Sequence, residues 1–277
     1  MTRSPENSHL SCAQTAQPAL SFENVCHRYV TKNRESVLAV TDVDLKIQPG
    51  EFVSVVGPSG CGKSTLLRIA GGLMQPSEGV VSFFGEPISK PRRDVSIVFQ
   101  DAVMLPWLNI LQNVTLPVKL AGGDMSKAKH KAMELLKRVG LAGFALQAPK
   151  NLSGGMRQRA GIVRALMNEP KALLMDEPFG ALDALTREQM NFDLAHIAEY
   201  SGCSVLLITH GISEAVLLGD RVVVMSARPG CIAEIIPIDL PRPRGRETLV
   251  MPRFAELCDQ VRKHFRHDSN EMAFNHD

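Results

Sequence analysis

Nine consecutive residues, Gly57 to Thr65, read GPSGCGKST and match in full the phosphate-binding pattern G-x-x-x-x-G-K-[ST]. Glycines let such a loop curl until its N–H groups point at phosphate oxygens, and a following helix adds its positive end. Lys63 offers a charge to the β- and γ-phosphates, Ser64 a hard oxygen ligand for Mg²⁺, and Thr65 a hydroxyl for the α-phosphate. A glycine turn that only joins a strand to a helix is the weaker interpretation, because the whole pattern is present. The predicted nucleotide contacts here are Gly57, Pro58, Ser59, Gly60, Cys61, Gly62, Lys63, Ser64 and Thr65.

A second pair of glycines opens another predicted helix. In NLSGGMRQRAGIVRAL, which starts at Asn151, Ser153 occupies the expected N-cap position. Gly154 and Gly155 have no side chains that would cover the backbone N–H groups. Such a helix start can bind an anion. Taken alone, however, these residues favour a plain capped helix, since a serine and a glycine are common at helix starts.

Carboxylates and a histidine follow two further apolar runs. ALLMDEP places Asp176 and Glu177 directly after a predicted strand, and CSVLLITH places His210 at the end of another. One carboxylate can hold Mg²⁺ through water while the other accepts a proton from an attacking water. Because the ends of parallel strands gather at one sheet edge, these residues are expected to meet Gly57 and Gln100 around one ligand.

The elements that must position these residues alternate between strands and helices. The apolar patterns predict strands at 20–29, 38–47, 51–57, 79–88 (a pair), 95–99, 171–178, 203–210 and 220–230. They predict helices at 63–73, 126–141, after Ser153, and at 187–200, 213–219 and 252–265. Such alternation implies a parallel sheet with helices on both faces. The helical residue pattern between Gln100 and Ser153 indicates an inserted helical segment. The strand at Val95–Phe99 is expected to be buried.

The composition and net charge limit the classes of protein to which the chain can belong. With 277 residues, 44% of them hydrophobic, it can bury a sizeable core, and a net charge of +2 gives no electrostatic case for nucleic acid. No run approaches the roughly 18 apolar residues that cross a bilayer. Residues 1–19 lack an apolar signal core and are expected to form a disordered leader, so a cytoplasmic chain with six reduced cysteines is predicted.

Residues 241–277 are expected to form a C-terminal tail with a short helix. Within it, PRPRGR, Pro241 to Arg246, is interpreted as a stiff basic loop that is simply solvated. The chain beyond Arg266 is expected to fray.

Taken together and in this order, the motifs resemble those of the ATP-binding subunits of ABC transporters. The order is the phosphate loop, Gln100, the signature LSGGMRQR, the Walker B run LLMDE, the D-loop ALD at Ala181–Asp183, and His210; the likeness covers about residues 20–235. The fold that this implies is α/β: a P-loop NTPase (RecA-like) core with a mostly parallel sheet, an antiparallel β subdomain and an inserted α-helical subdomain at about 101–165. The ATPase domain would span 20–240.

The resemblance also assigns roles within one subunit. It implies that Glu177 is the general base and that His210 contacts the γ-phosphate of ATP. Mg²⁺ would be held by Ser64, Asp176 and Gln100, and Gln100 would also contact the attacking water. With Lys63, the implied catalytic set is Lys63, Gln100, Glu177 and His210.

Other implied roles concern the base and the dimer. Tyr29 would stack on adenine, although a core position in its strand explains this residue as well. In that family two subunits pack head to tail, and the signature loop of one closes on the ATP of the other. Ser153, Gly154 and Gly155 would therefore contact the partner's ATP, and Asp183 would act across the dimer interface.

Three longer stretches of sequence indicate a subgroup within this family. VFQDAVMLPWLNILQNVTLP, DEPFGALDALTREQM and DRVVVMSARPG look like the nitrate, sulfonate and taurine importer subgroup. This implies a homodimeric ATPase at the cytoplasmic face of a bacterial inner membrane, with separate permease subunits and, indirectly, a periplasmic solute-binding protein. An importer ATPase for a vitamin or pyrimidine precursor and a non-transport ABC ATPase are the alternatives, whereas the signature loop and late histidine disfavour a P-loop kinase or GTPase.

The single tryptophan, Trp107, lies in the apolar stretch FQDAVMLPWLNI. An apolar cluster is core by default. In ABC importers, however, this segment lines the cleft that receives a coupling helix of the permease. A division is therefore expected, with some of these side chains buried within the insert and Trp107 or a neighbour at the permease-facing rim.

Overall fold

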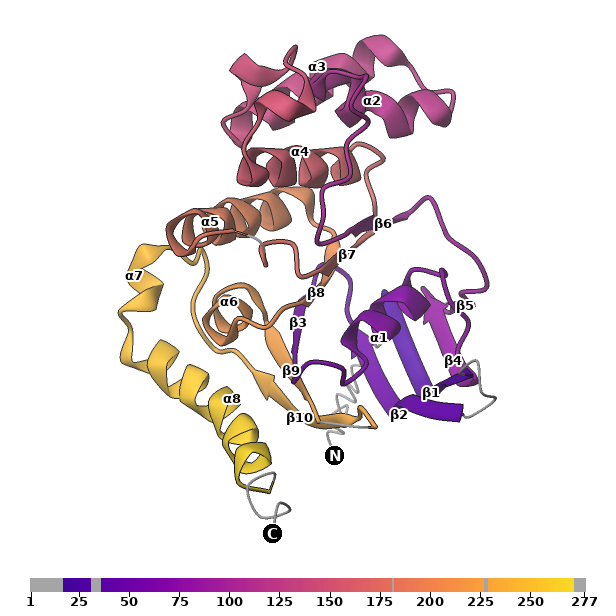
Figure 1. The fold of residues 1–277 in the computed structure, drawn as a ribbon, viewed down its shortest axis with the longest axis vertical. Coiled ribbons are helices and arrows are strands. Elements are labelled where there is room, and N and C mark those ends of the chain that lie inside the picture. Colours follow the sequence, from indigo (N-terminus) through magenta and orange to yellow (C-terminus); the bar gives the residue numbers. More distant parts are fainter. Residues whose placement is uncertain (1–16, 31–35, 181, 227–228, 272–277) are drawn as a thin grey trace, which may run out of the picture.

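Two β-sheets and a helical region organise the chain (Figure 1). The protein is described from a computed structural model, in which residues 17–30, 36–180, 182–226 and 229–271 are described, the side chains of 266–271 excepted. Most of the predicted leader, residues 1–16, lies outside the described residues, as does Ala181 of the ALD motif.

The larger sheet has six strands in the order β10-β9-β3-β8-β7-β6. Its strands β6, β7, β8, β3 and β9 pair in parallel, and β10 pairs antiparallel with β9. Their bounds are β3 Phe52–Val56, β6 Val95–Val98, β7 Ala172–Asp176, β8 Ser204–Ile208, β9 Arg221–Met225 and β10 Ile232–Pro237. The central strands β3 and β8 are buried throughout, as their unbroken apolar runs predict.

The smaller sheet is antiparallel, with the order β2-β1-β4-β5. Its strands are β1 Leu20–Val30, β2 Ser36–Ile47, β4 Glu78–Phe83 and β5 Glu86–Pro87. Helix α1, Lys63–Ala70, contacts strands of both sheets, and Leu66, Leu67 and Ile69 are buried between them. This packing fixes the helix that follows the phosphate loop (Figure 1).

The insert between β6 and β7 is helical, as expected. It holds α2 Ile110–Leu120, α3 Met125–Arg138 and α4 Gly154–Leu166, with 3₁₀ turns at Ala142–Phe144 and Pro149–Asn151. The sequence predicts α3 and α4 but not α2, whose interior Pro117 is untypical of a helix. Asn109 is the N-cap of α2 and forms a capping box with Gln112. The predicted α/β class is thereby confirmed, with its mostly parallel sheet, antiparallel β subdomain and helical insert.

Strand β6 corrects one expectation. Val95–Phe99 was expected to be a buried strand, but β6 is the edge of its sheet, Val95 to Ile97 are half-buried, and Phe99 is 46% exposed. An apolar run shows that a segment suits a sheet, but not whether strands cover both of its edges.

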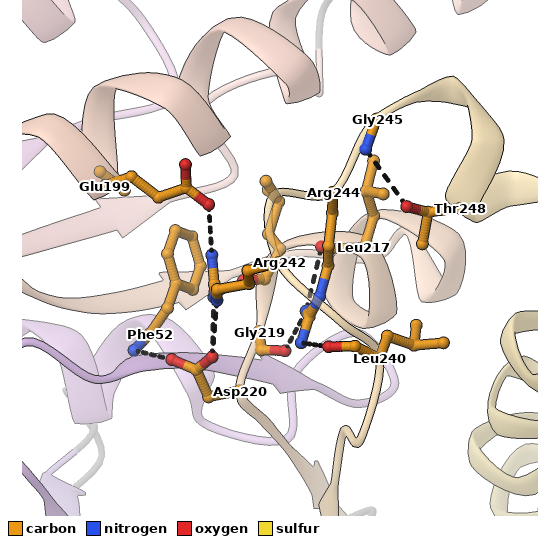
Figure 2. Close-up of polar contacts among 12 residues, drawn as sticks. Phe52, Glu199, Leu217, Gly219, Asp220, Leu240, Arg242, Arg244, Gly245 and Thr248 are labelled. Carbon is orange, nitrogen blue, oxygen red and sulfur yellow. Dashed lines mark hydrogen bonds and ion pairs between the residues drawn. The ribbon is translucent and has the colours of Figure 1, made fainter.

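The C-terminal tail corrects another expectation. Arg244 in PRPRGR is 2% exposed, so the prediction of a solvated loop is wrong. Its guanidinium donates hydrogen bonds to five carbonyl oxygens, which belong to Val216, Leu217, Gly219, Ile238 and Leu240. The first three lie at the end of α6, Ile212–Leu218 (Figure 2). The last carbonyls of a helix lack intrahelical partners. An arginine side chain, with five N–H donors, can satisfy several of them at once.

Arg242 joins the same cluster from the other side. Its guanidinium donates to Asp220 Oδ1 at 2.8 Å and to Glu199 Oε1 at 3.3 Å, while Asp220 Oδ2 accepts from the N–H of Phe52 at 2.9 Å (Figure 2). The cluster therefore links the start of β3 to α5, Ala184–Ser201, and to the tail.

Beyond this cluster the tail is helical for longer than expected. It forms α7, Arg246–Leu249, and α8, Pro252–Glu271, a helix of 20 residues that continues past Arg266, where fraying was expected. Phe254, Leu257 and Val261 of α8 are buried in one apolar cluster with Ala215 and Val216 of α6. Burial of one face of α8 against α6 stabilises the helix as far as Phe265.

Candidate nucleotide site

The phosphate loop lies between β3 and α1, as predicted. Gly60 and Gly62 have φ angles of 80° and 92°, a region that strains other residues. A Cβ on Gly62 would lie 2.3 Å from Val40 Cγ1 and 2.8 Å from the Ala39 carbonyl oxygen. The loop therefore needs glycine for its curvature and for the close approach of β2.

Lys63 lies across this loop. Its ammonium donates to the Gly57 carbonyl at 2.8 Å and the Pro58 carbonyl at 3.0 Å, and it lies 3.8 Å from Cys61 Sγ. Cys61 is buried, and burial raises the pKa of its thiol despite the nearby ammonium. The loop thus holds a positive charge beside a neutral thiol at the start of a helix.

An oxygen pair connects α1 with the end of β7. The Ser64 hydroxyl donates to Asp176 Oδ1 at 3.0 Å. A hydroxyl and a carboxylate are hard oxygen donors, and Mg²⁺ in nucleotide sites often takes only one or two protein ligands besides phosphate oxygens. This donor set fits the predicted role of Ser64 and Asp176.

Glu177 and His210 form a pair at the same sheet edge. Their Oε1 and Nε2 atoms are 2.6 Å apart, and the Glu177 N–H donates to the carbonyl of Ile208 in β8 at 2.9 Å. Glu177 has a φ angle of 47°, a left-handed conformation that costs a non-glycine residue roughly 1–3 kcal/mol. Such strain typically occurs where surrounding structure holds a functional side chain in place.

The phosphate loop, Glu177 and His210 border one cavity of about 540 Å³. Six of the nine predicted loop residues line it, namely Ser59, Gly60, Gly62, Lys63, Ser64 and Thr65, together with Glu177 and His210. Tyr29 lies at its wall, 37% exposed, and its hydroxyl is 3.0 Å from Thr65 Oγ1. The alternative of a core position for Tyr29 is therefore wrong.

Gln100 lies in an adjoining cavity of about 250 Å³, which Glu177 and His210 also line. Its amide nitrogen would be 3.3 Å from a Cβ on Gly180, and Glu177 Oε2 would be 3.7 Å from the same point. Gln100 and Glu177 therefore border the same cavity. Of the four residues expected to gather at one edge, His210 lines both cavities and Gln100 the smaller one. Gly57 and Asp176 line neither cavity, but each contacts a residue of the phosphate-loop cavity, Lys63 and Ser64 respectively.

The signature residues lie elsewhere. Ser153 caps α4 by accepting from the Met156 N–H at 3.3 Å, and Ser153 and Gly154 are exposed. Among the described residues, the cavity of the phosphate loop is lined by none of Ser153, Gly154 and Gly155. Asp183, also exposed, caps α5 by accepting from Thr186, and these hydrogen bonds lower the pKa of its carboxyl. One chain therefore presents its second helix start away from its own phosphate loop.

Comparison with known proteins decides the family. The family model described as "ABC transporter" matches residues 40–180, just over half of the chain. The chain belongs to the ABC transporter family. An ABC ATP-binding cassette is an ATP hydrolase that binds ATP or ADP, acts as a dimer and works with membrane permeases, so the predicted class of enzyme is confirmed.

Two curated relatives match this cassette over most of their length. A putative ATP-binding protein of Brucella abortus, BAB2_1147, is 45% identical over 245 residues, covering 88% of this chain and 92% of its own. The nitrate import ATP-binding protein NrtD of Synechococcus elongatus is 43% identical over 259 residues, covering 91% of this chain and 94% of its own.

Solved structures agree on the fold. The cassette MJ0796, described as a bacterial ABC transporter cassette in a dimeric structure, superposes with a TM-score of 0.71 at 34% identity, over 80% of this chain and 100% of that one. A second dimeric structure of MJ0796 is described as a post-hydrolysis state bound to ADP and Pi.

Two polar residues beside His210 escaped the sequence analysis. Thr209 directly precedes the histidine, and Glu214 lies in the first turn of α6; both are buried. A threonine at a strand end and a glutamate in a first helical turn are common in proteins, so neither position carries a distinctive signal.

Proposed function

We propose that this cassette is the ATPase subunit of a bacterial importer for a small anionic solute, such as an aliphatic sulfonate, taurine or nitrate. The observation that carries its ATPase role is the Glu177–His210 pair, 2.6 Å apart, at the cavity that the phosphate loop lines. The similarity along most of the chain to NrtD, a nitrate import ATP-binding protein, supports the solute class.

In this proposal Glu177 is the general base that accepts the proton of the attacking water. His210 orients that carboxylate through the 2.6 Å contact and reaches the γ-phosphate from the cavity wall. Lys63 neutralises phosphate charge, and Tyr29 packs on the adenine at the mouth of the cavity. Ser64, Asp176 and Gln100 would hold Mg²⁺, which supplies charge stabilisation to the transferred phosphoryl group when bound.

The exposed second helix start supports a homodimer. The start of α4, with Ser153 as its N-cap and an exposed Gly154, suits the phosphates of a partner's ATP. Asp183 caps the neighbouring helix on the exposed surface. Each nucleotide would then lie between the phosphate loop of one subunit and the signature loop of the other.

The segment after Gln100 supports contact with a permease. Trp107 is 75% exposed and Val103 67%, whereas Leu105 and Leu108 are half-buried. The buried Asn113 holds this segment: its amide donates to the carbonyls of Leu105 and Leu108 at 3.1 Å each. An exposed tryptophan on an anchored segment suits a protein partner. In the described part of the chain no helix is long and apolar enough to span a membrane, and we place the cassette peripherally, at the cytoplasmic face.

Replacement of the general base tests the ATPase role. Glu177→Gln should keep ATP binding and lower turnover by about 10²–10⁴-fold, because the amide cannot accept the proton of water. It should also accumulate an ATP-bound dimer, measured by size-exclusion chromatography. Glu134→Gln, at an exposed position of α3, is the matched control and should behave as the wild type. Turnover of Glu177→Gln at the wild-type rate would contradict the assignment.

Growth tests the solute. A strain lacking this chain should fail to use taurine or alkanesulfonate as its sulfur source, or nitrate as its nitrogen source. The wild-type chain should restore growth and Glu177→Gln should not. Normal growth of the deletion strain on all three, together with intact ATPase activity of the purified protein, would refute the solute class and leave the enzyme assignment standing.

A further inference from the structure

The backbone around His210 is closed by a hydrogen-bonded bracket. Thr209 Oγ1 accepts from the Gly211 N–H at 2.9 Å and donates to Glu214 Oε2 at 2.7 Å. The hydroxyl thus accepts one hydrogen bond from the backbone and gives its single proton to the carboxyl oxygen. Thr209 is 3% exposed and Glu214 7%, so water competes little with either bond. His210 lies in sequence between the residues that this bracket joins.

The bracket is fixed to the sheet that carries the rest of the site. The Thr209 N–H donates to the carbonyl of Val55 in β3, the strand that leads into the phosphate loop, at 3.1 Å. Space within the bracket is small: a Cβ on Gly211 would lie 3.0 Å from Glu214 Oε2 and 3.2 Å from Glu214 Cβ. The hydrogen bonds, the β3 anchor and the tight packing together favour one arrangement of residues 209–214.

Glu214 occupies a costly position for a carboxyl group. Burial raises its pKa and the Glu177 carboxylate adds to this, while the Thr209 hydrogen bond and Arg187 act in the opposite direction. Among the described residues Glu214 Oε1 has no hydrogen-bond partner. A buried polar oxygen without a partner destabilises a fold, so the stability of the fold alone does not explain this residue.

We propose that Thr209 and Glu214 are positioning residues for His210. They hold the backbone on both sides of the histidine, and so keep its Nε2 atom 2.6 Å from Glu177 Oε1 and the general base in its working orientation. This inference rests on the proposed roles of Glu177 and His210. A displacement of about 1 Å at a catalytic group can cost on the order of 100-fold in rate.

The test compares variants that break the bracket with variants that keep it. Thr209→Val, without the hydroxyl, and Glu214→Leu, without the acceptor, should each lower kcat for ATP by about 10- to 100-fold. Their KM for ATP should stay within about twofold, because neither residue lines the cavity of the phosphate loop. Thr209→Ser and Glu214→Gln, which keep the donor and the acceptor, should restore kcat to near the wild-type value.

Ser204 offers a matched control at the opposite end of β8. Its hydroxyl also accepts from a backbone N–H, that of Gly50 at 3.0 Å, and donates to an oxygen, the Gln48 carbonyl at 3.1 Å, and the residue is 2% exposed. Ser204→Ala should lower the melting temperature as much as Thr209→Val does, yet leave kcat unchanged. An equal loss of kcat in Ser204→Ala would reduce the bracket to a purely structural role and overturn the proposal.

The His210→Ala variant distinguishes a failure of the positioning role of Thr209 and Glu214 from a failure of the proposed role of His210. If His210→Ala is inactive while Thr209→Val and Glu214→Leu turn over at the wild-type rate, the positioning role is wrong and the proposed function stands. If His210→Ala itself turns over normally, the proposed role of the histidine fails, whatever the bracket variants do. Inactive His210→Ala, slow bracket variants and restored conservative variants support both.

Discussion

Arg244 is expected to be the residue of the tail whose loss destabilises the protein most clearly. Its guanidinium is buried and donates to five carbonyl oxygens, at 2.6 to 3.3 Å, in the cluster of Figure 2. Burial, aided by Arg242, lowers the pKa of Arg244 to about 10, so the group is still charged at neutral pH. Arg244→Met keeps an apolar stem and removes all five donated bonds.

The size of the effect follows from two opposing contributions. A hydrogen bond with a charged donor contributes about 1.5–3 kcal/mol to stability. The net loss on substitution is smaller than the sum over five such bonds, because the substitution also removes the cost of burying a charge. A buried carbonyl oxygen left without a donor costs about 1–3 kcal/mol, and we take a net loss of about 3–5 kcal/mol for the five carbonyls together. At roughly 2–4 °C per kcal/mol for a chain of this size, the melting temperature of Arg244→Met should fall by roughly 6–20 °C.

The assay is thermal unfolding of the full chain without nucleotide, followed by circular dichroism. Arg253→Met is the matched control, since Arg253 lies in α8 of the same tail but pairs with Asp239 and Glu256 at the surface. An exposed ion pair contributes about 0–1 kcal/mol, so the control should melt close to the wild type. Equal melting temperatures for Arg244→Met and Arg253→Met would refute the reasoning that the buried carbonyls depend on this guanidinium.

Two further outcomes test the surfaces of the cassette. Ser153→Arg should bind ATP as a monomer but fail to form the ATP-dependent dimer, with turnover lower by about 100-fold or more, as for a lost transition-state contact; size-exclusion chromatography and steady-state turnover measure this, and normal hydrolysis would exclude the cross-subunit role. Trp107→Ala should keep soluble ATPase activity and melting temperature, because the side chain is 75% exposed, but lose coupling to transport in vesicles that contain the permease. A lower melting temperature with coupling intact would instead assign Trp107 to the core.

Several parts of the site could be read from the sequence because they depend on local constraints. The phosphate loop needs glycine at Gly60 and Gly62 for left-handed φ angles, and a neighbouring lysine and serine complete a pattern that few other structures require. Buried parallel strands need unbroken apolar runs, so the positions of Asp176 and His210 after two such runs predicted their meeting at one sheet edge.

Other features depended on which distant groups come together. The sequence shows that PRPRGR is basic, but only the packing of α6 brings its last carbonyl oxygens within reach of a buried Arg244 guanidinium. Likewise an apolar pattern identified Val95–Phe99 as a strand without revealing that it lies at an edge.

The bracket around His210 belongs to this second group, since it depends on the distance between a strand end and the first turn of a helix. A chain's local pattern specifies backbone angles and which faces avoid water, and from the sequence alone this predicted the phosphate loop and most of the elements, though not α2. The order of the motifs indicated the family. The partner of a polar side chain is chosen in three dimensions, by the donors and acceptors that secondary structure leaves unpaired, and only the tertiary structure decided those partners.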